Sequence, residues 1–167
     1  MKTINLLFSA HLLTAIAALA ISLALGGALE AALVVVFFGG LWFFSQQQGM
    51  GGWGTILLFL FGLACGIGFW MDLTPGLLLL AIVATLGAWD LDQFSQRLRS
   101  VERVDLDSGL GKNHLRRLFL IESLGLLAGA AGLTARLQIT FWAAVLLVIL
   151  ALVGISRLVI FIKKELE

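Results

Sequence analysis

One acidic side chain lies deep inside an apolar stretch of the sequence, which makes it the strongest candidate for chemistry. Glu122 follows Arg117 by five residues, so on a helix it lies about 7.5 Å further along the axis. A carboxylate at that depth in a membrane is costly and often marks a functional site. Arg157 has a comparable depth in the next apolar stretch and is its predicted partner. The pair is expected to be either a structural ion pair or a site that binds a proton or a substrate.

A histidine in the first apolar stretch is the second candidate. His11 lies about two helical turns after Lys2, at a depth similar to that of Glu122. A histidine there could titrate near neutral pH or could simply form a hydrogen bond between helices, and both interpretations stay open. A polar layer around it would also include Ser9, Ser123 and Ser156.

A cluster of basic residues follows the fourth apolar stretch. It would attract anionic lipid headgroups or an acidic partner protein. It is equally well explained as a determinant of membrane orientation alone. Its members are Arg97, Arg99, Arg103, Lys112, Arg116 and Arg117.

Acidic residues near this cluster do not complete a metal site. Asp105 and Asp107 match the opening of a calcium loop, but the bidentate Glu that closes such a loop is missing. Asp90 and Asp92 are instead expected to pair with the neighbouring arginines or to be solvated.

No nucleophile lies near a base and no glycine-rich phosphate loop is present, so we expect neither an enzyme nor a metal. No cofactor is predicted, although lipid, quinone or pigment would need no diagnostic residues to occupy apolar helix grooves.

The composition determines what kind of fold must hold these residues. Hydrophobic residues make up 60% of the 167-residue chain and charged residues 13%, against about 45–50% and about 25% in a soluble domain. A soluble fold of this size could not bury so much apolar surface, so lipid must solvate it. The sequence therefore predicts an all-α, polytopic integral membrane protein. Without a basic tail or alternating aromatic and basic residues, nucleic-acid binding is not expected.

Six apolar stretches approach the roughly 20 residues that a spanning helix needs. The connections between the first and second, third and fourth, and fifth and sixth stretches hold only turns. The stretches therefore predict three antiparallel hairpins within one domain, 1–167. The first stretch resembles a secretory signal peptide and is interpreted as a retained membrane helix. The helices are predicted at about 4–25, 28–44, 53–71, 75–91, 115–135 and 140–162, with an amphipathic cytoplasmic segment at about 92–104.

Two residue patterns bear on helix starts and on orientation. Pro75 behind Thr74 suits a helix start, and Asn113 is the expected cap of the fifth helix.

The distribution of charge predicts the orientation in the membrane. With both termini in the cytoplasm, ten of the 11 Lys and Arg residues face inside, and only Arg136 faces outside. The tryptophans are expected in the two interfacial belts: Trp42, Trp53 and Trp89 inside, Trp70 and Trp142 outside. This pattern predicts a multi-pass protein of an inner or plasma membrane.

Two functional classes fit this architecture. The first is a non-catalytic accessory, scaffold or assembly subunit of a larger membrane complex, whose partners would be the bilayer and other membrane subunits or a second copy. The alternative is a small transporter or channel component, a substrate-binding membrane subunit with a polar site on its cytoplasmic side. Gly62-x-x-x-Gly66 and Gly125-x-x-x-Gly129 allow close helix approach, either within the bundle or between chains.

Overall fold

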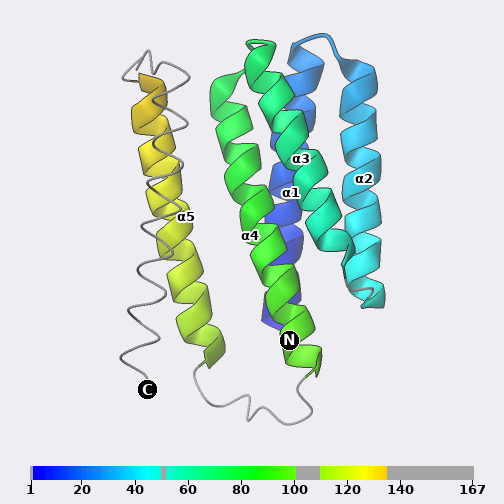
Figure 1. The fold of residues 1–167 in the computed structure, drawn as a ribbon, viewed down its shortest axis with the longest axis vertical. Helices are drawn as coiled ribbons and strands as arrows, with labels where there is room; N and C mark the ends of the chain where they lie inside the picture. The colour runs from blue at the N-terminus through cyan, green and yellow to red at the C-terminus, as the bar shows by residue number, and fades with distance from the viewer. Residues whose placement is uncertain (1, 50–51, 101–109, 135–167) are drawn as a thin grey trace. The chain divides into compact units, whose positions relative to one another are not determined.

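The computed structural model describes residues 2–49, 52–100 and 110–134, and every regular element within them is an α-helix (Figure 1). The helices are α1 (Lys2–Leu25), α2 (Leu29–Gln48), α3 (Trp53–Trp70), α4 (Pro75–Ser100) and α5 (Leu110–Thr134). All five are long and apolar enough to cross a membrane. Helices suit this role because they satisfy their backbone polar groups internally, where lipid offers no partners. The predicted sixth span, 140–162, lies outside the described residues.

Tight turns join α1 to α2 and α3 to α4. Gly27 adopts φ +82°, and the amide of Ala28 donates to the Leu23 carbonyl at 2.9 Å, which closes a Schellman motif at the end of α1. Asp72 takes the same left-handed conformation after α3, with φ 52°. Glycine and aspartate tolerate this conformation better than most residues, which explains why the helices end there.

The helix α1 packs most extensively against α4 and also contacts α2, while α4 contacts α3 and α5. Ile4, Phe8, Leu12, Ala15 and Leu19 form the buried stripe of α1. Their spacing of three or four residues places them on one helical face, which explains why this face turns inward.

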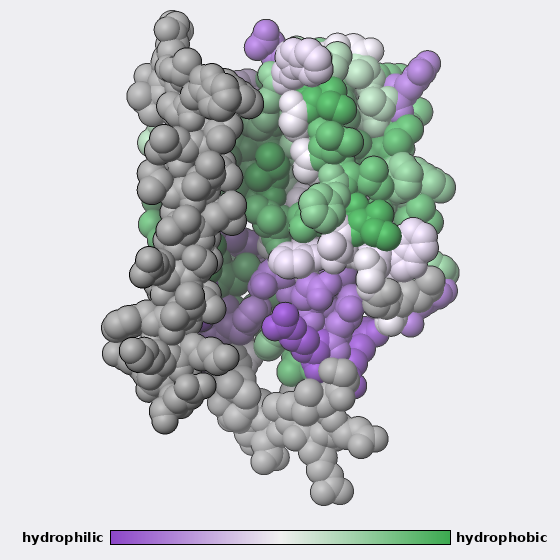
Figure 2. All heavy atoms as spheres, viewed as in Figure 1, coloured by the Kyte–Doolittle hydropathy of each residue, from purple (hydrophilic) through white to green (hydrophobic). Residues whose placement is uncertain are grey.

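The polar side chains gather at one end of the described helices, where α1 and α5 begin and α2 and α4 end (Figure 2). We call this the polar end. The remaining surface is mostly apolar, with exposed side chains such as Leu33, Phe37, Phe59 and Leu127. An apolar surface of this kind is expected for helices that lie in lipid.

The bounds of two helices differ from those expected from the sequence. α4 does not end near residue 91 but continues as one helix through Ser100, so most of the predicted segment 92–104 belongs to it (Figure 1). Asp92, Phe94 and Leu98 hold this part against the other helices. α5 begins at Leu110 rather than near residue 115, so Asn113 lies inside the helix and is not its cap.

Candidate functional site

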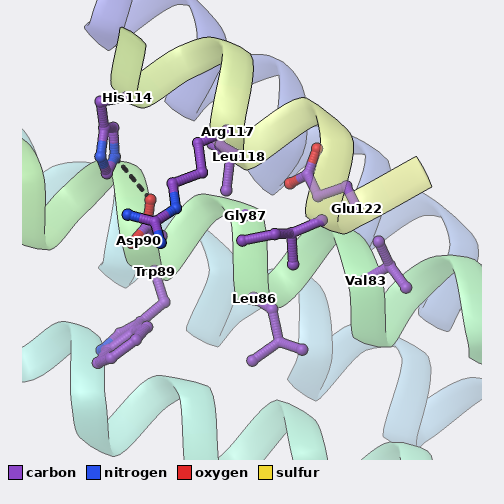
Figure 3. A pocket seen from close by; sticks show the side chains of 10 residues that line it. Val83, Leu86, Gly87, Trp89, Asp90, His114, Arg117, Leu118 and Glu122 are labelled. Carbon is purple, nitrogen blue, oxygen red and sulfur yellow. Dashed lines mark ion pairs between the residues drawn. The ribbon is translucent and has the colours of Figure 1, made fainter. Parts of the chain in front are cut away.

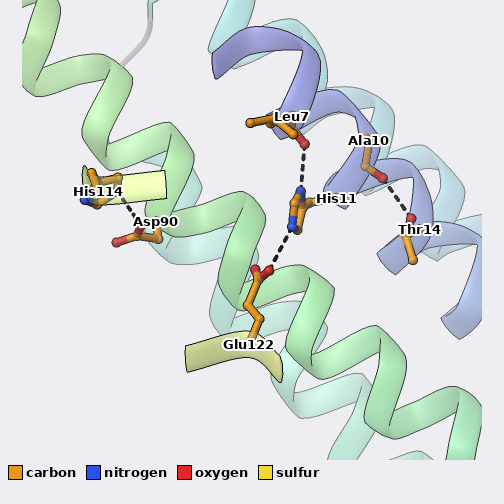
Figure 4. Close-up of polar contacts among 7 residues, drawn as sticks. All are labelled: Leu7, Ala10, His11, Thr14, Asp90, His114 and Glu122. Atoms are coloured by element: carbon orange, nitrogen blue, oxygen red, sulfur yellow. Dashed lines mark hydrogen bonds and ion pairs between the residues drawn. The ribbon is translucent and has the colours of Figure 1, made fainter. Parts of the chain in front are cut away.

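The central feature of the site is a contact between His11 of α1 and Glu122 of α5. His11 Nε2 lies 3.1 Å from Glu122 Oε2, and the two side chains are only 15% and 12% exposed. The other ring nitrogen, Nδ1, lies 2.8 Å from the backbone carbonyl oxygen of Leu7, one turn earlier in α1 (Figure 4). The imidazole is therefore held at both nitrogens, and the pair joins two helices that are more than a hundred residues apart in the sequence.

A glycine of α4 makes room for this contact. A Cβ added at Gly87 would overlap Glu122 Oε1 and would lie 2.6 Å from His11 Cδ2. Any other residue at this position would push the two side chains apart or displace α4. The site is thus built by three helices: α1 and α5 supply the polar groups, and α4 supplies the space.

A pocket of about 420 Å³ between α4 and α5 leads to Glu122 (Figure 3). Its apolar wall includes Val83, Leu86 and Ile121. Its polar groups are Asp90 of α4 and His114, Arg117 and Glu122 of α5. In Figure 3 the first three of these groups lie together, and Glu122 lies apart from them along α5. Glu122 Oε1 is buried and has no hydrogen-bond partner among the described residues.

A second histidine–carboxylate contact lies nearer the polar end. His114 Nε2 is 2.8 Å from Asp90 Oδ2, but the ring N–H does not point at the oxygen as a hydrogen bond requires. The His114 ring stacks on Phe94, with centroids 4.1 Å apart and planes 9° from parallel. The His114 side chain is 29% exposed and the Asp90 side chain is 38% exposed. Water therefore screens the His114–Asp90 contact more than the His11–Glu122 contact.

Glu122 is also bordered by a second, smaller pocket. This pocket, of about 190 Å³, lies among α1, α4 and α5, and its lining includes His11, Thr14, Ala84 and Leu126. The Thr14 hydroxyl donates to the Ala10 carbonyl at 2.9 Å and so is already engaged (Figure 4). Glu122 therefore lines two pockets, and the larger one also reaches the charged residues near the polar end.

A buried carboxylate that the sequence did not single out lies in α4. Asp92 is 2% exposed, and its two oxygens accept hydrogen bonds from Trp42 Nε1 and Gln96 Nε2, each at 3.2 Å. Asp92 was expected either to pair with the neighbouring arginines or to be solvated; it is not solvated, and these two hydrogen bonds come from Trp42 and Gln96. Trp42 is fully buried, with Phe8 and Phe61 rings edge-on to it, so its ring packs inside the bundle and does not face lipid. A signal existed in the sequence, because Asp92 and Gln96 are spaced to meet on one helical face.

The predicted site residues fall into three groups. His11 and Glu122 are brought together, whereas Arg157, the predicted partner of Glu122, lies outside the described residues, as does Arg103. The remaining basic residues lie near the polar end on α4 and α5. Arg99 approaches Gly49 at the C-terminus of α2, where a cation interacts favourably with the helix dipole. Arg97 and Arg116 are exposed, Arg117 lines the larger pocket, and Lys112 belongs to the first turn of α5.

The acidic residues of the described helices do not gather into a metal site. Within residues 2–49, 52–100 and 110–134, no group of three or more His, Cys, Asp or Glu side chains is arranged to hold a metal ion. Asp105 and Asp107, which begin the calcium-like pattern, lie outside these ranges. What the described site offers is a carboxylate with one free oxygen, an imidazole held at both nitrogens, and an apolar pocket with charged groups along one wall. Such a site suits a proton or a small polar solute.

Comparison with known proteins adds no relative: no family model matches the chain, and no curated protein or solved structure is significantly similar to it.

Proposed function

We propose that this chain is the membrane component of a transport system and that it binds a small ion or polar solute at Glu122 and His11. The observation that carries the proposal is the pocket of about 420 Å³ that joins Asp90, His114 and Arg117 to the buried Glu122 Oε1, an oxygen with no partner in the described part of the chain. A structural ion pair needs no such pocket. A transported ion or solute needs a polar site inside the membrane and a route to it from one side.

The energetics support a functional role for Glu122. An aspartate carboxylate at the centre of a membrane helix costs about 2.5–3.5 kcal/mol on insertion scales. A hydrogen bond between membrane helices stabilises the folded protein by only about 0.6 kcal/mol on average. The contact with His11 therefore does not by itself offset the cost of placing Glu122 there.

Charge movement on a solid-supported membrane tests the proposal. Proteoliposomes would be exposed to jumps in H⁺, Na⁺, K⁺ and NH₄⁺ concentration, and at least one jump is expected to give a current above that of empty vesicles. Glu122→Gln is expected to abolish that current. The matched control is Glu30→Gln, the same change at an exposed carboxylate in the first turn of α2. The absence of any wild-type current, or equal currents in wild type and Glu122→Gln, would reject the proposal.

An accessory, scaffold or assembly subunit of a larger membrane complex is the second candidate. One observation favours it: a Cβ added at Gly62 or Gly66 of α3 would meet no described atom within 4 Å. By contrast, Gly129 of the other glycine pair allows Leu79 of α4 to pack closely. The α3 pair is thus not used for packing among the described helices and is available to a partner helix.

Mild detergent extraction from native membranes, followed by native gel and mass spectrometry, separates the two candidates. Stable migration with other subunits, lost in Gly62→Leu, is expected of an accessory subunit. Migration as a lone 18.0 kDa chain would reject that candidate.

The topology proposed with this function has six spans and both termini on the cytoplasmic side of an inner or plasma membrane. The distribution of basic residues supports it. Cysteine labelling in a Cys65→Ala background tests it, because Gln48 and Asp72 are exposed at opposite ends of the described helices. Gln48→Cys should react only from the cytoplasm and Asp72→Cys only from outside; the opposite pattern would overturn this orientation.

A further inference from the structure

The contacts of His11 determine where one of its protons lies. Nδ1 is 2.8 Å from the carbonyl oxygen of Leu7, and a carbonyl oxygen can only accept a hydrogen bond. Nδ1 therefore carries a hydrogen and donates it to Leu7. In a neutral imidazole this leaves Nε2, the nitrogen that faces Glu122, with a lone pair and no hydrogen.

The second contact then requires one further proton. Nε2 lies 3.1 Å from Glu122 Oε2, and an ionised carboxylate has only acceptors. A hydrogen bond forms in either of two protonation states. In one, a protonated Nε2 donates to an ionised carboxylate; in the other, a carboxylic acid donates to an unprotonated Nε2. Both arrangements contain the same number of protons and have no net charge. If that proton leaves, two lone pairs face each other and the contact is repulsive.

We propose that the His11–Glu122 pair is a binding site for a single exchangeable proton and that this proton holds α1 against α5. The inference rests on the proposed function and names H⁺ as the ion that the site takes. No covalent or redox step is involved, because the proton binds between Nε2 and Oε2 and returns to water.

The surroundings of the pair fit this assignment. Glu122 Oε1 has no partner among the described residues, and the larger pocket that Glu122 lines extends toward the polar end, which gives a proton a route to the pair. The other charged or titratable described groups that line its two pockets are Asp90 of α4 and His114 and Arg117 of α5; α1 adds only the uncharged Thr14. Gly87 leaves the space that allows the two side chains to meet.

Nuclear magnetic resonance and infrared spectroscopy test the assignment without measuring transport. The chain has 2 histidines, so His114→Gln leaves His11 as the single ¹⁵N-histidine reporter in nanodiscs. We expect a protonated Nδ1, together with either a protonated Nε2 or a carboxylic-acid C=O band that shifts on H/D exchange. Glu122→Gln should lose the second signal, because its amide donates to Nε2 and adds no acidic proton. An unprotonated Nδ1, or equal spectra with and without Glu122→Gln, would overturn the proposal.

Spin labels on α1 and α5 test the mechanical consequence. Leu13 and Ser123 are exposed positions on these helices and can carry labels in a Cys65→Ala background. We expect the distance between the labels to lengthen or broaden as the pH is raised in wild type. It should stay short in Glu122→Gln, where the amide hydrogen bond persists. Unchanged distances in wild type would overturn the proposed link between the helices, and if Glu122→Gln does not fold, His11→Asn provides the second comparison.

The transport function and the proton site can be rejected separately. If the spectra show the bound proton but no ion jump gives a current, the transport function is rejected and the proton site stands. If a Na⁺ or K⁺ jump gives a Glu122-dependent current while the spectra show no shared proton, the transport function stands and H⁺ is the wrong ion.

Discussion

Gly87 of α4 lies directly beside the Glu122 carboxylate of α5, and no Cβ fits between them. The residue without a side chain thus determines whether the polar contact across α1 and α5 can form. Glycine has a cost within a helix, about 0.5–1 kcal/mol relative to alanine in water. The close approach of the carboxylate explains why this cost is tolerated here.

Gly87→Ala is expected to destabilise the protein by about 1–3 kcal/mol, because the added methyl group overlaps Glu122 Oε1 and crowds His11 Cδ2. Reversible unfolding in mixed detergent micelles, followed by tryptophan fluorescence, measures the change. Gly40→Ala in α2 is the matched control, since its Cβ would meet no described atom within 4 Å. A loss no greater than that of Gly40→Ala would show that Glu122 moves aside at no cost.

Two substitutions at Glu122 should differ in stability. Glu122→Gln keeps a hydrogen-bond donor for His11 Nε2 and should cost less than about 1 kcal/mol. Glu122→Ala leaves that nitrogen buried without a partner and should cost about 1–3 kcal/mol. The same unfolding assay compares them. If Ala is tolerated as well as Gln, the contact contributes nothing to holding α1 against α5.

Asp92→Leu should be the most disruptive change at the polar end. The carboxylate is 2% exposed and accepts hydrogen bonds from both Trp42 and Gln96, so its removal leaves the buried Trp42 donor and the part-buried Gln96 donor unpaired. A buried unpaired donor such as Trp42 Nε1 costs about 1–3 kcal/mol. A double-mutant cycle with Trp42→Phe isolates the Trp42–Asp92 term, and we expect a coupling energy of about 0.5–3 kcal/mol. Additive effects would indicate that this hydrogen bond does not stabilise the fold.

Asp90→Asn should have a small effect. Asp90 and His114 are more exposed than the deeper pair, and exposed ion pairs contribute about 0–1 kcal/mol. The stacking of His114 on Phe94 does not depend on the carboxylate and should keep the ring in place. We therefore expect a loss below about 1 kcal/mol in the unfolding assay. A loss as large as that of Glu122→Ala would mean that the polar-end contact is the main link between α4 and α5.

The sequence by itself determined the helical class and much of the helix placement. Apolar stretches of near-spanning length predict helices because lipid offers the backbone no partners. Pro75 begins α4 as predicted, since its fixed φ suits the first helical position. Glu122 and His11 could be singled out because a polar side chain in an apolar stretch is costly, and their similar depths followed from the helical rise.

Only the tertiary structure decided which polar groups meet. Depth along the sequence favoured Arg157 as the partner of Glu122 and placed His11 only at a similar level, whereas the packing of α1 and α5 around Gly87 brought His11 to it. Asp92 was misjudged for the same reason. Its position near the end of an apolar stretch suggested solvent or the neighbouring arginines, but Trp42 comes to it from a different helix. Depth is a local property of one helix, whereas a contact depends on the rotation of two helices about their axes, which packing sets.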